Sequence, residues 1–439
     1  MMKRQWRLAL LVAVLAIALL ANVSCAEKDD GDNGGSTGGD EIGAVTVMGV
    51  WGGTEVEAFN KVVAGWQAET GGTVEFEATR DLSAILRARV SGGNPPDLAI
   101  LPNPALMQDF AGSGELVALD DVLDMSMLES DYSPTWIDLG SVAGKLHGLF
   151  IKAATKSTVW YDPAQFAAAG YTAPKTWDEL KTLSGRMVAD GKAAPWSIGL
   201  ESGGASGWPG TDWIQEIFLT ESGPETYDKW VKHEIPWTDP AVKSAFQRFG
   251  EMALTDGYVP GGVPAILAAN FEDASYFPFE DPPKAYMYFL GAFTQGFISR
   301  QFPDQVAGTD YDFFKFVEIN EPGTVTGGAD VLVMFNDTPS ARSLMNYLAD
   351  GANWSSWAET GGFATPSQAL DPGSYPDDLA RKAAAQLTDS QTFRFDADDL
   401  MPAEVQTAYF AGVLDYLQNP GNLDSILANI ESVAVTAYQ

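Results

Sequence analysis

The residues best suited to chemistry lie in the segment ESGGASGWPGTDW, at positions 201–213. Its glycines let a ligand approach the main chain, and Trp208 and Trp213 offer broad aromatic faces beside the carboxylate of Asp212. The segment has no basic residue, histidine or cysteine. A carboxylate only accepts hydrogen bonds, so this set suits a flat, uncharged ligand rich in hydroxyl groups. The alternative is that both tryptophans belong to the core.

Other candidate ligand-binding residues stand at the ends of predicted strands or interrupt apolar segments. Trp51 follows an apolar strand and precedes two glycines; its alternative role is packing between domains. Asp81 and Asn103 follow the next two strands, where Asp81 either caps a helix or presents a free oxygen to a ligand. Lys152 and Asp330 are charged residues within apolar strands, where an unpaired charge is costly, and this favours exposure to a cleft.

The elements that position these residues alternate between strand and helix. AVTVMGVW (44–51), TVEFEA (73–78) and PPDLAIL (95–101) predict strands, each followed by a helical pattern. This alternation predicts a parallel sheet flanked by helices, with ligands beyond the carboxyl ends of the strands. From Tyr161 the chain is rich in helical patterns, with further apolar strands near 284–291 and 329–335.

Length and charge restrict the class of protein. The 439 residues allow about two domains, and a net charge of −33 disfavours nucleic acid and anionic lipid surfaces as partners. No cluster of Arg or Lys lies near the tryptophan-rich segments, as an anionic ligand would require. His147 and His233 are far apart in sequence, and there is one cysteine, so we expect no catalytic metal and no cofactor.

The first residues predict export. MMKRQWR is basic, and Leu8–Ala21 is an apolar run too short for a typical spanning helix. Cys25 then stands where a bacterial lipoprotein signal places its lipid-bearing cysteine, although Asn22 departs from the usual leucine. We expect a signal peptide over 1–24, then the acylated cysteine and a flexible tether over 25–43. The alternative is ordinary signal cleavage with an incidental cysteine.

Several motifs resemble one family over nearly the whole mature chain. VWYDPAQFAAAGYTAPKTWDEL (159–180) resembles a hallmark of family 1 extracellular solute-binding proteins, the capture components of bacterial ABC importers. GLESGGASGWPGTDW (199–213), HEIPWTDPAVKSAF (233–246) and TFRFDADDLMP (392–402) are most similar to its alpha-glucoside-binding branch. The resemblance implies that Phe293, Gly362 and Phe363 also contact the ligand.

The resemblance implies a two-lobed, hinged α/β fold of the periplasmic-binding-protein type. Each lobe is expected to contain a parallel-rich sheet flanked by helices, and the chain to cross between the lobes more than once. The expected crossings lie near 152–160, 285–292 and 334–340. The expected lobes are 44–155 with 291–335, and 156–290 with 336–439.

Two function classes remain open. The first is a binding protein, expected to be a monomer, that captures a small neutral sugar outside the cytoplasmic membrane and delivers it to permease subunits of an ABC importer. It would touch the membrane only through its N-terminal lipid. The second is a glycoside hydrolase, which needs two carboxylates flanking the scissile bond. With 59 acidic residues some pair always satisfies that spacing, so the count of carboxylates does not discriminate. The resemblance along the whole chain, together with the signal, cysteine and tether, favours the binding protein. Polyamines and iron chelates are minor alternatives as ligands.

Overall fold

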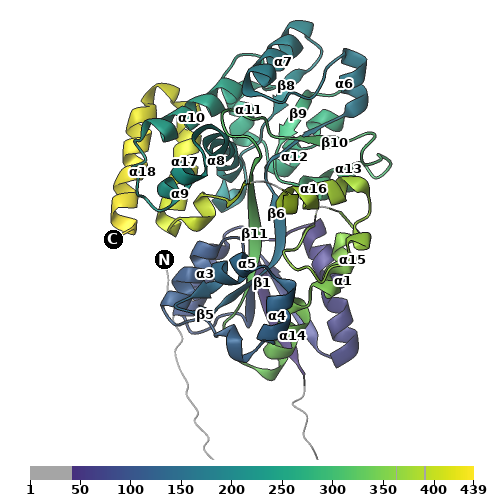
Figure 1. The fold of residues 1–439 in the computed structure, drawn as a ribbon, viewed down its shortest axis with the longest axis vertical. Coiled ribbons are helices and arrows are strands. Elements are labelled where there is room, and N and C mark those ends of the chain that lie inside the picture. Colours follow the sequence, from purple (N-terminus) through teal and green to yellow (C-terminus); the bar gives the residue numbers. More distant parts are fainter. Residues whose placement is uncertain (1–41, 362, 390–391) are drawn as a thin grey trace, which may run out of the picture. The chain divides into compact units, whose positions relative to one another are not determined.

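The computed structural model describes residues 42–361, 363–389 and 392–439, all within the compact unit Glu41–Gln439. Within this unit two lobes are built around separate sheets (Figure 1). The first lobe contains the sheet ordered β12-β11-β3-β1-β2, with β6 paired to β11. The second lobe contains the sheet ordered β10-β7-β9-β8. The predicted two-lobed α/β fold is confirmed.

The first lobe follows the predicted alternation of strands and helices. Its sheet strands are β1 (Ala44–Gly49), β2 (Thr73–Ala78), β3 (Leu98–Leu101), β6 (Gly148–Thr155), β11 (Thr324–Met334) and β12 (Thr392–Phe395), and β4 (Ser141–Val142) pairs with β5 (Lys145–Leu146). Its helices are α1 (Thr54–Thr70), α2 (Leu82–Ser91), α3 (Pro104–Gly112), α4 (Met125–Asp131), α5 (Pro134–Leu139), α14 (Pro339–Ala349) and α15 (Ser355–Ala358). Strand β1 pairs in parallel with β2 and β3, so their carboxyl ends meet at one edge.

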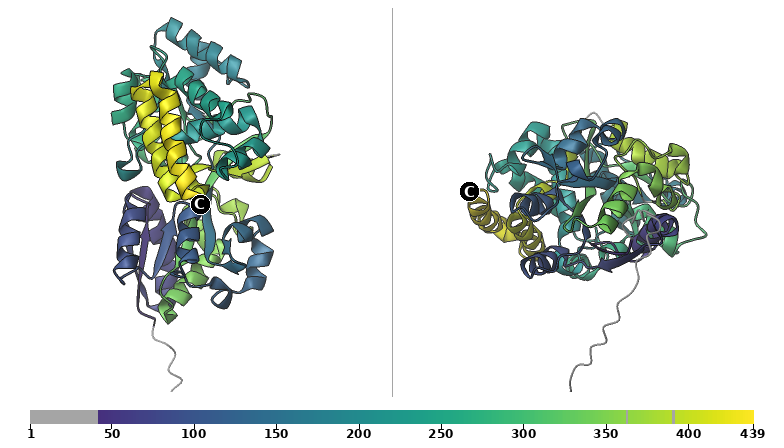
Figure 2. Two further views of the ribbon diagram at one scale, coloured as in Figure 1. Left: turned by 90° about the vertical axis from the view of Figure 1, so that its left-hand side faces the viewer. Right: turned by 90° about the horizontal axis from the view of Figure 1, so that it is seen from below.

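The second lobe is richer in helix. Its strands are β7 (Thr158–Tyr161), β8 (Ala194–Ser197), β9 (Ala285–Phe289) and β10 (Asp312–Lys315). Its helices are α6 (Pro163–Ala169), α7 (Trp177–Asp190), α8 (Trp208–Ser222), α9 (Pro224–Val231), α10 (Pro240–Ala253), α11 (Gly262–Ala268), α12 (Phe271–Ala274), α13 (Thr294–Gln301), α17 (Ala403–Gln418) and α18 (Leu423–Ala437). Figure 2 shows α17 and α18 packed side by side on this lobe.

The sheet of the second lobe differs from the parallel-rich sheet that was expected. Only β8 and β9 pair in parallel, whereas β7 pairs antiparallel with both β9 and β10. Strand β7 brings the chain into this lobe, and β10 leads it back toward β11. Because β7 enters the lobe and its neighbour β10 leads out of it at the same edge, these two strands run in opposite directions.

The chain crosses between the two sheets several times. The first crossing is Lys156–Ser157, between β6 and β7, and the second is the segment 316–323, between β10 and β11. A later crossing, at 396–397, follows β12 and leads into the helices of the second lobe. Helix α16 (Asp378–Asp389) packs against β6 beside these crossings (Figure 1).

The expected lobe boundaries differ from the observed packing after residue 290. Phe297 and Ile298 of α13 pack with β7 and β9 in the second lobe, although 291–335 was expected in the first. Leu344 and Leu348 of α14 pack under β1 in the first lobe, although 336–439 was expected in the second. The segments 285–292 and 334–340 are therefore not crossings. Apolar patterns specify that a helix is buried but not which sheet covers it, and this explains the difference.

Candidate ligand-binding site

A cleft of about 1020 Å³ lies between the two lobes. The first lobe lines it with the ends of β1 and β3, the start of α2, and the middle of β6 and β11. The second lobe contributes the loop 202–206, the start of α8, the residues 396–399 and one face of α17. Of the predicted residues, those that line the cleft are Trp51, Asp81, Asn103, Lys152, Trp208, Asp212, Phe293 and Asp330.

Lys152 is buried on the first-lobe side of the cleft and forms ion pairs. Its Nζ lies 2.5 Å from Glu55 Oε1 and 3.6 Å from Asp330 Oδ2. Burial lowers the pKa of Lys152, but the two carboxylates outweigh it, so the pKa is raised and the ammonium stays charged. Asp330 also accepts a 2.9 Å hydrogen bond from Trp51 Nε1. Lys152 thus lies at the cleft, as predicted, but its charge is neutralised by Glu55, which comes from a distant part of the chain.

Lys156 forms a second buried ion-pair cluster on the other side of the cleft. Its Nζ lies 2.8 Å from Asp212 Oδ2 and 2.9 Å from Asp396 Oδ2. Burial raises the pKa of Asp212 well above its usual value, while Lys156 opposes the shift. Burial and the neighbouring Asp396 raise the pKa of Asp398 to about 7. Asp399 has a raised pKa for the same reasons, burial first and its acidic neighbours next.

The acidic side of this cluster retains open hydrogen-bond acceptors. Within the described part of the chain, Oδ1 of Asp396 and Oδ1 of Asp398 are buried without a hydrogen-bond partner. Both residues line the cleft. A buried acceptor without a donor is costly, so these oxygens favour a ligand that donates hydrogen bonds.

Aromatic rings separate the two ion-pair clusters. Trp208 packs edge-on against Phe271, with 5.1 Å between the ring centroids. The centroid of the Phe293 ring lies 6.2 Å from that of Trp208. The ammonium of Lys156 lies 4.8 Å above the Trp208 ring, and both Lys152 and Lys156 lie 5.9 Å from the Phe293 ring. These contacts hold the rings in fixed orientations at the cleft.

The rim of the cleft brings the two lobes into contact. Asp81 occupies the N-cap position of α2, but its side chain makes no capping hydrogen bond. Its carboxylate lies against Gly204 of the second lobe, where a Cβ would collide with it. The Arg80 guanidinium lies 5.5 Å from the centre of the Phe271 ring. Asn103, by contrast, caps α3 by accepting a 2.9 Å hydrogen bond from the Leu106 amide.

Trp213 does not reach the cleft, and its prediction as a ligand contact is wrong. The segment 201–213 is not a continuous loop, because α8 begins at Trp208 directly before Pro209. Asp212, one helical turn after Trp208, faces the same side, whereas Trp213 is rotated a further 100°. Trp213 is 1% exposed and packs edge-on against Trp196 at 4.9 Å.

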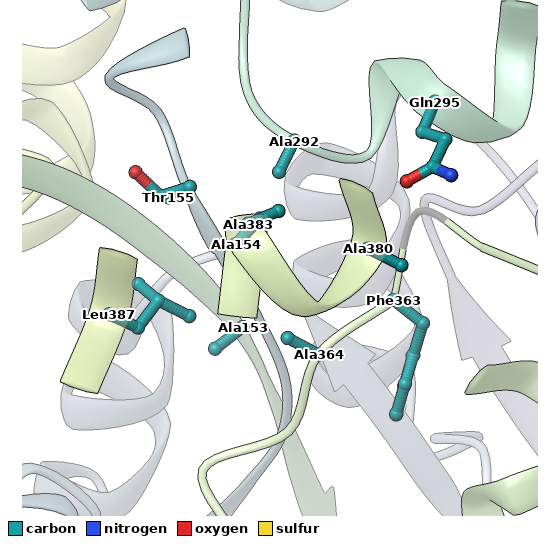
Figure 3. Close-up of a pocket in the computed structure, with 10 residues that line it drawn as sticks. All are labelled: Ala153, Ala154, Thr155, Ala292, Gln295, Phe363, Ala364, Ala380, Ala383 and Leu387. Atoms are coloured by element: carbon teal, nitrogen blue, oxygen red, sulfur yellow. The ribbon is translucent and has the colours of Figure 1, made fainter. Parts of the chain in front are cut away.

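Phe363 also lies in a core and not in the cleft. It is 4% exposed and stacks on Trp354 at 5.7 Å. Its ring borders a separate cavity of about 10 Å³ that is lined in part by alanines of β6 and α16 (Figure 3). The neighbouring Gly362 lies outside the described residues, as does Cys25.

Several cleft residues were missed by sequence reasoning. They are Glu55, Lys156, Phe271, Asp396, Asp398, Asp399 and Phe410. The acidic run at 396–399 belongs to the motif TFRFDADDLMP and was a usable signal. Lys156 carried no such signal, because its partners are 56 and 240 positions away in the chain.

Among the described residues, no group of three or more His, Cys, Asp or Glu side chains has an arrangement that could hold a metal ion. In the same residues, every helix is either too short or too polar to cross a membrane.

Two α/β lobes that enclose a cleft of buried ion pairs and aromatic rings define a solute-binding protein. The chain belongs to the bacterial extracellular solute-binding protein family, whose model matches residues 52–353. The osmoprotective compounds-binding protein GgtB of Synechocystis sp. is 38% identical over 411 residues, covering 92% of this chain and 94% of that protein. The alpha-glucosides-binding periplasmic protein AglE of Rhizobium meliloti is 36% identical over 392 residues, covering 87% and 84%.

Solved structures of low sequence identity share the fold. The bacterial solute receptor AcbH, described as having an exclusive preference for β-D-galactopyranose, has a TM-score of 0.79 at 20% identity and covers 91% of this chain and all of that chain. The maltose-bound MalE3 of T. maritima has a TM-score of 0.73 at 17% identity, covering 90% and 99%. These likenesses establish the two-lobed architecture.

Proposed function

We propose that this protein captures a neutral carbohydrate, an alpha-glucoside or another small oligosaccharide, and delivers it to the permease of an ABC importer. The observation that carries the proposal is the chemistry of the cleft. Both buried lysines of the cleft, Lys152 and Lys156, are ion-paired, so neither presents a free ammonium to an anionic ligand. Aromatic faces and open carboxylate oxygens instead match the C–H faces and hydroxyl donors of a sugar.

The ligand contacts are divided between the lobes. The first lobe offers Trp51 and Asp330, and the second offers Trp208, Asp212 and Phe293. A sugar contacts both sets only when the lobes are closed, so binding shifts the protein from an open to a closed form. The function needs no chemical step, and we propose that the protein has no catalytic activity.

The alpha-glucoside assignment and the membrane attachment are finer parts of the same proposal. The identity of 36% with the alpha-glucosides-binding protein AglE supports that ligand class. We further propose a signal peptide over 1–24 and lipidation of Cys25. The tether 25–43 then holds a monomeric binding unit at the outer face of the cytoplasmic membrane, near the permease.

A thermal-shift screen of the full-length chain in mild detergent tests the proposal. The panel contains maltose, trehalose, sucrose and maltotriose, with spermidine, a ferric chelate and citrate as charged comparisons. A sugar at about a hundred times its Kd stabilises the folded state by roughly 2.7 kcal/mol. The sugar that binds is then incubated with the protein and must be recovered intact. A response to charged solutes alone contradicts carbohydrate capture, and sustained sugar hydrolysis contradicts a pure binding function.

A further inference from the structure

The cleft continues beyond the two ion-pair clusters into an arm between α2 of the first lobe and α17 of the second. We call this arm the outer arm. On the α2 side it is lined by Ala84, Ile85 and Arg87. On the α17 side the lining residues are Ala403, Glu404, Gln406, Thr407, Phe410, Ala411 and Leu414. The spacing of the α17 residues at three and four positions shows that a single helix face borders the arm.

Phe410 is the aromatic residue of the outer arm. It is half-buried, and it belongs to none of the hydrophobic core clusters of the described residues. Trp208 and Phe293, by contrast, pack against each other and against further rings. Phe410 lines the cleft, and within the described part of the chain no other aromatic ring packs on it.

The position of Phe410 relative to the inner cleft is fixed by close backbone packing. Gly207, the residue before α8, has φ +110° and lies so close to the Phe410 main chain that a Cβ would collide with it. Phe410 is thus held beside Trp208, which begins α8. The outer arm is therefore continuous with the inner cleft.

The polar groups of the outer arm suit a neutral ligand. Glu404 and Thr407 are exposed on the cleft-facing side of α17 and can hydrogen-bond hydroxyl groups. On the opposite wall Arg87 is paired with Asp109 at 2.5 Å. An aromatic face flanked by hydroxyl and carboxylate groups repeats the chemistry of the inner cleft.

The volume of the cleft agrees with a ligand that extends into this arm. A pocket for a drug-sized ligand has roughly 300–1,000 Å³, and the cleft has about 1020 Å³. We propose that the outer arm is a binding subsite for a third pyranose unit, stacked on Phe410 and hydrogen-bonded by Glu404 and Thr407. The proposal rests on the proposed carbohydrate function and specifies the ligand as an oligosaccharide of at least three units.

Calorimetric titration of the full-length chain in detergent with maltose and maltotriose tests this subsite. We expect the wild-type protein to bind maltotriose about tenfold more tightly than maltose, which corresponds to about 1.4 kcal/mol for the added ring. Phe410→Ala should weaken maltotriose binding about tenfold and maltose binding less than twofold. Phe302→Ala is the matched control, because Phe302 is a half-buried phenylalanine of the second lobe that packs on Tyr276 away from the cleft.

A second variant tests the arm without removing a packed side chain. Thr407→Trp adds bulk at an exposed position of the arm and should exclude maltotriose while maltose still binds. Equal affinities for the two sugars, or equal losses in Phe410→Ala, would overturn the outer subsite and leave the proposed function intact. If neither sugar binds, the alpha-glucoside assignment fails and the subsite fails with it.

Discussion

Removal of the Lys156 ammonium should destabilise the protein far more than neutralisation of Asp212, one of the two carboxylates paired with it. Lys156 balances Asp212, Asp396, Asp398 and Asp399, so Lys156→Met leaves a buried group of carboxylates without a counter-charge. Breaking a buried pair in this way costs about 3–5 kcal/mol of unfolding free energy. Asp212→Asn keeps the shape and leaves Lys156 paired with Asp396 at 2.9 Å, so its cost should stay below about 2 kcal/mol.

The pH dependence of the unfolding free energy gives the sharper test. The pKa of Asp398 is about 7 in the folded protein, compared with about 3.9 in an unfolded chain. Between these values the folded state binds more protons, so stability falls as the pH rises from about 4 through about 7. Lys156 opposes the raised pKa values of Asp212, Asp398 and Asp399, so its removal raises them further. The loss of unfolding free energy caused by Lys156→Met should therefore be larger at pH 8 than at pH 5.

Urea unfolding followed by tryptophan fluorescence at both pH values measures these differences. Lys382→Met serves as the control, because Lys382 is an exposed lysine that pairs with Asp312 at 2.8 Å on the surface. Its loss should cost less than about 1 kcal/mol at either pH. The electrostatic account of the cluster would be refuted if Lys156→Met lost the same unfolding free energy at pH 5 and pH 8. It would also be refuted if Asp212→Asn lost as much unfolding free energy as Lys156→Met.

Four other predictions follow from the same geometry. Trp208→Ala should weaken sugar binding by about 1–2 kcal/mol in calorimetry, whereas Trp213→Ala should lower the melting temperature and leave the affinity of the folded fraction unchanged. Glu216→Ala should lower the unfolding free energy by at least about 2 kcal/mol in urea, because it leaves the buried hydroxyl donors of Ser157 and Thr326 without their acceptor. Saturation with sugar should reduce the radius of gyration in small-angle scattering, and an unchanged value would indicate rigid lobes. Cys25→Ala should move the protein from the membrane to the soluble fraction, and more than one acyl chain is expected because a single chain anchors weakly.

The sequence predicted the parts of the site that depend on local structure. Trp51 and Asn103 were located from strand ends, and Asn103 also from its capping pattern, because both features depend on neighbouring residues alone. Trp213 was misplaced because the start of α8 at Trp208 was not recognised, and a helix changes which residues share a face. With helical spacing, Asp212 aligns with Trp208 and Trp213 does not.

Contacts between distant segments could not be predicted in the same way. The pairing of Lys152 with Glu55 was not predicted, because Glu55 is 97 positions away and no local pattern links the two residues. The prediction that α14 belongs to the second lobe was wrong for a related reason. Its apolar face indicates burial, but the sequence does not state which of two sheets provides the complementary surface.

Helix α8 explains how ligand contact and hinge geometry are connected. Its first turns carry Trp208 and Asp212, which line the cleft, and one turn later Glu216 is buried at 1% exposure. Glu216 accepts a 2.7 Å hydrogen bond from Ser157 in the first crossing, and it also bonds Thr326 of β11, beside the second crossing. The same helix therefore presents side chains to the cleft and bonds two connections between the lobes. We predict that a sugar bound at Trp208 and Asp212 acts on a helix that is also hydrogen-bonded beside both crossings, so that movement at the cleft reaches the hinge.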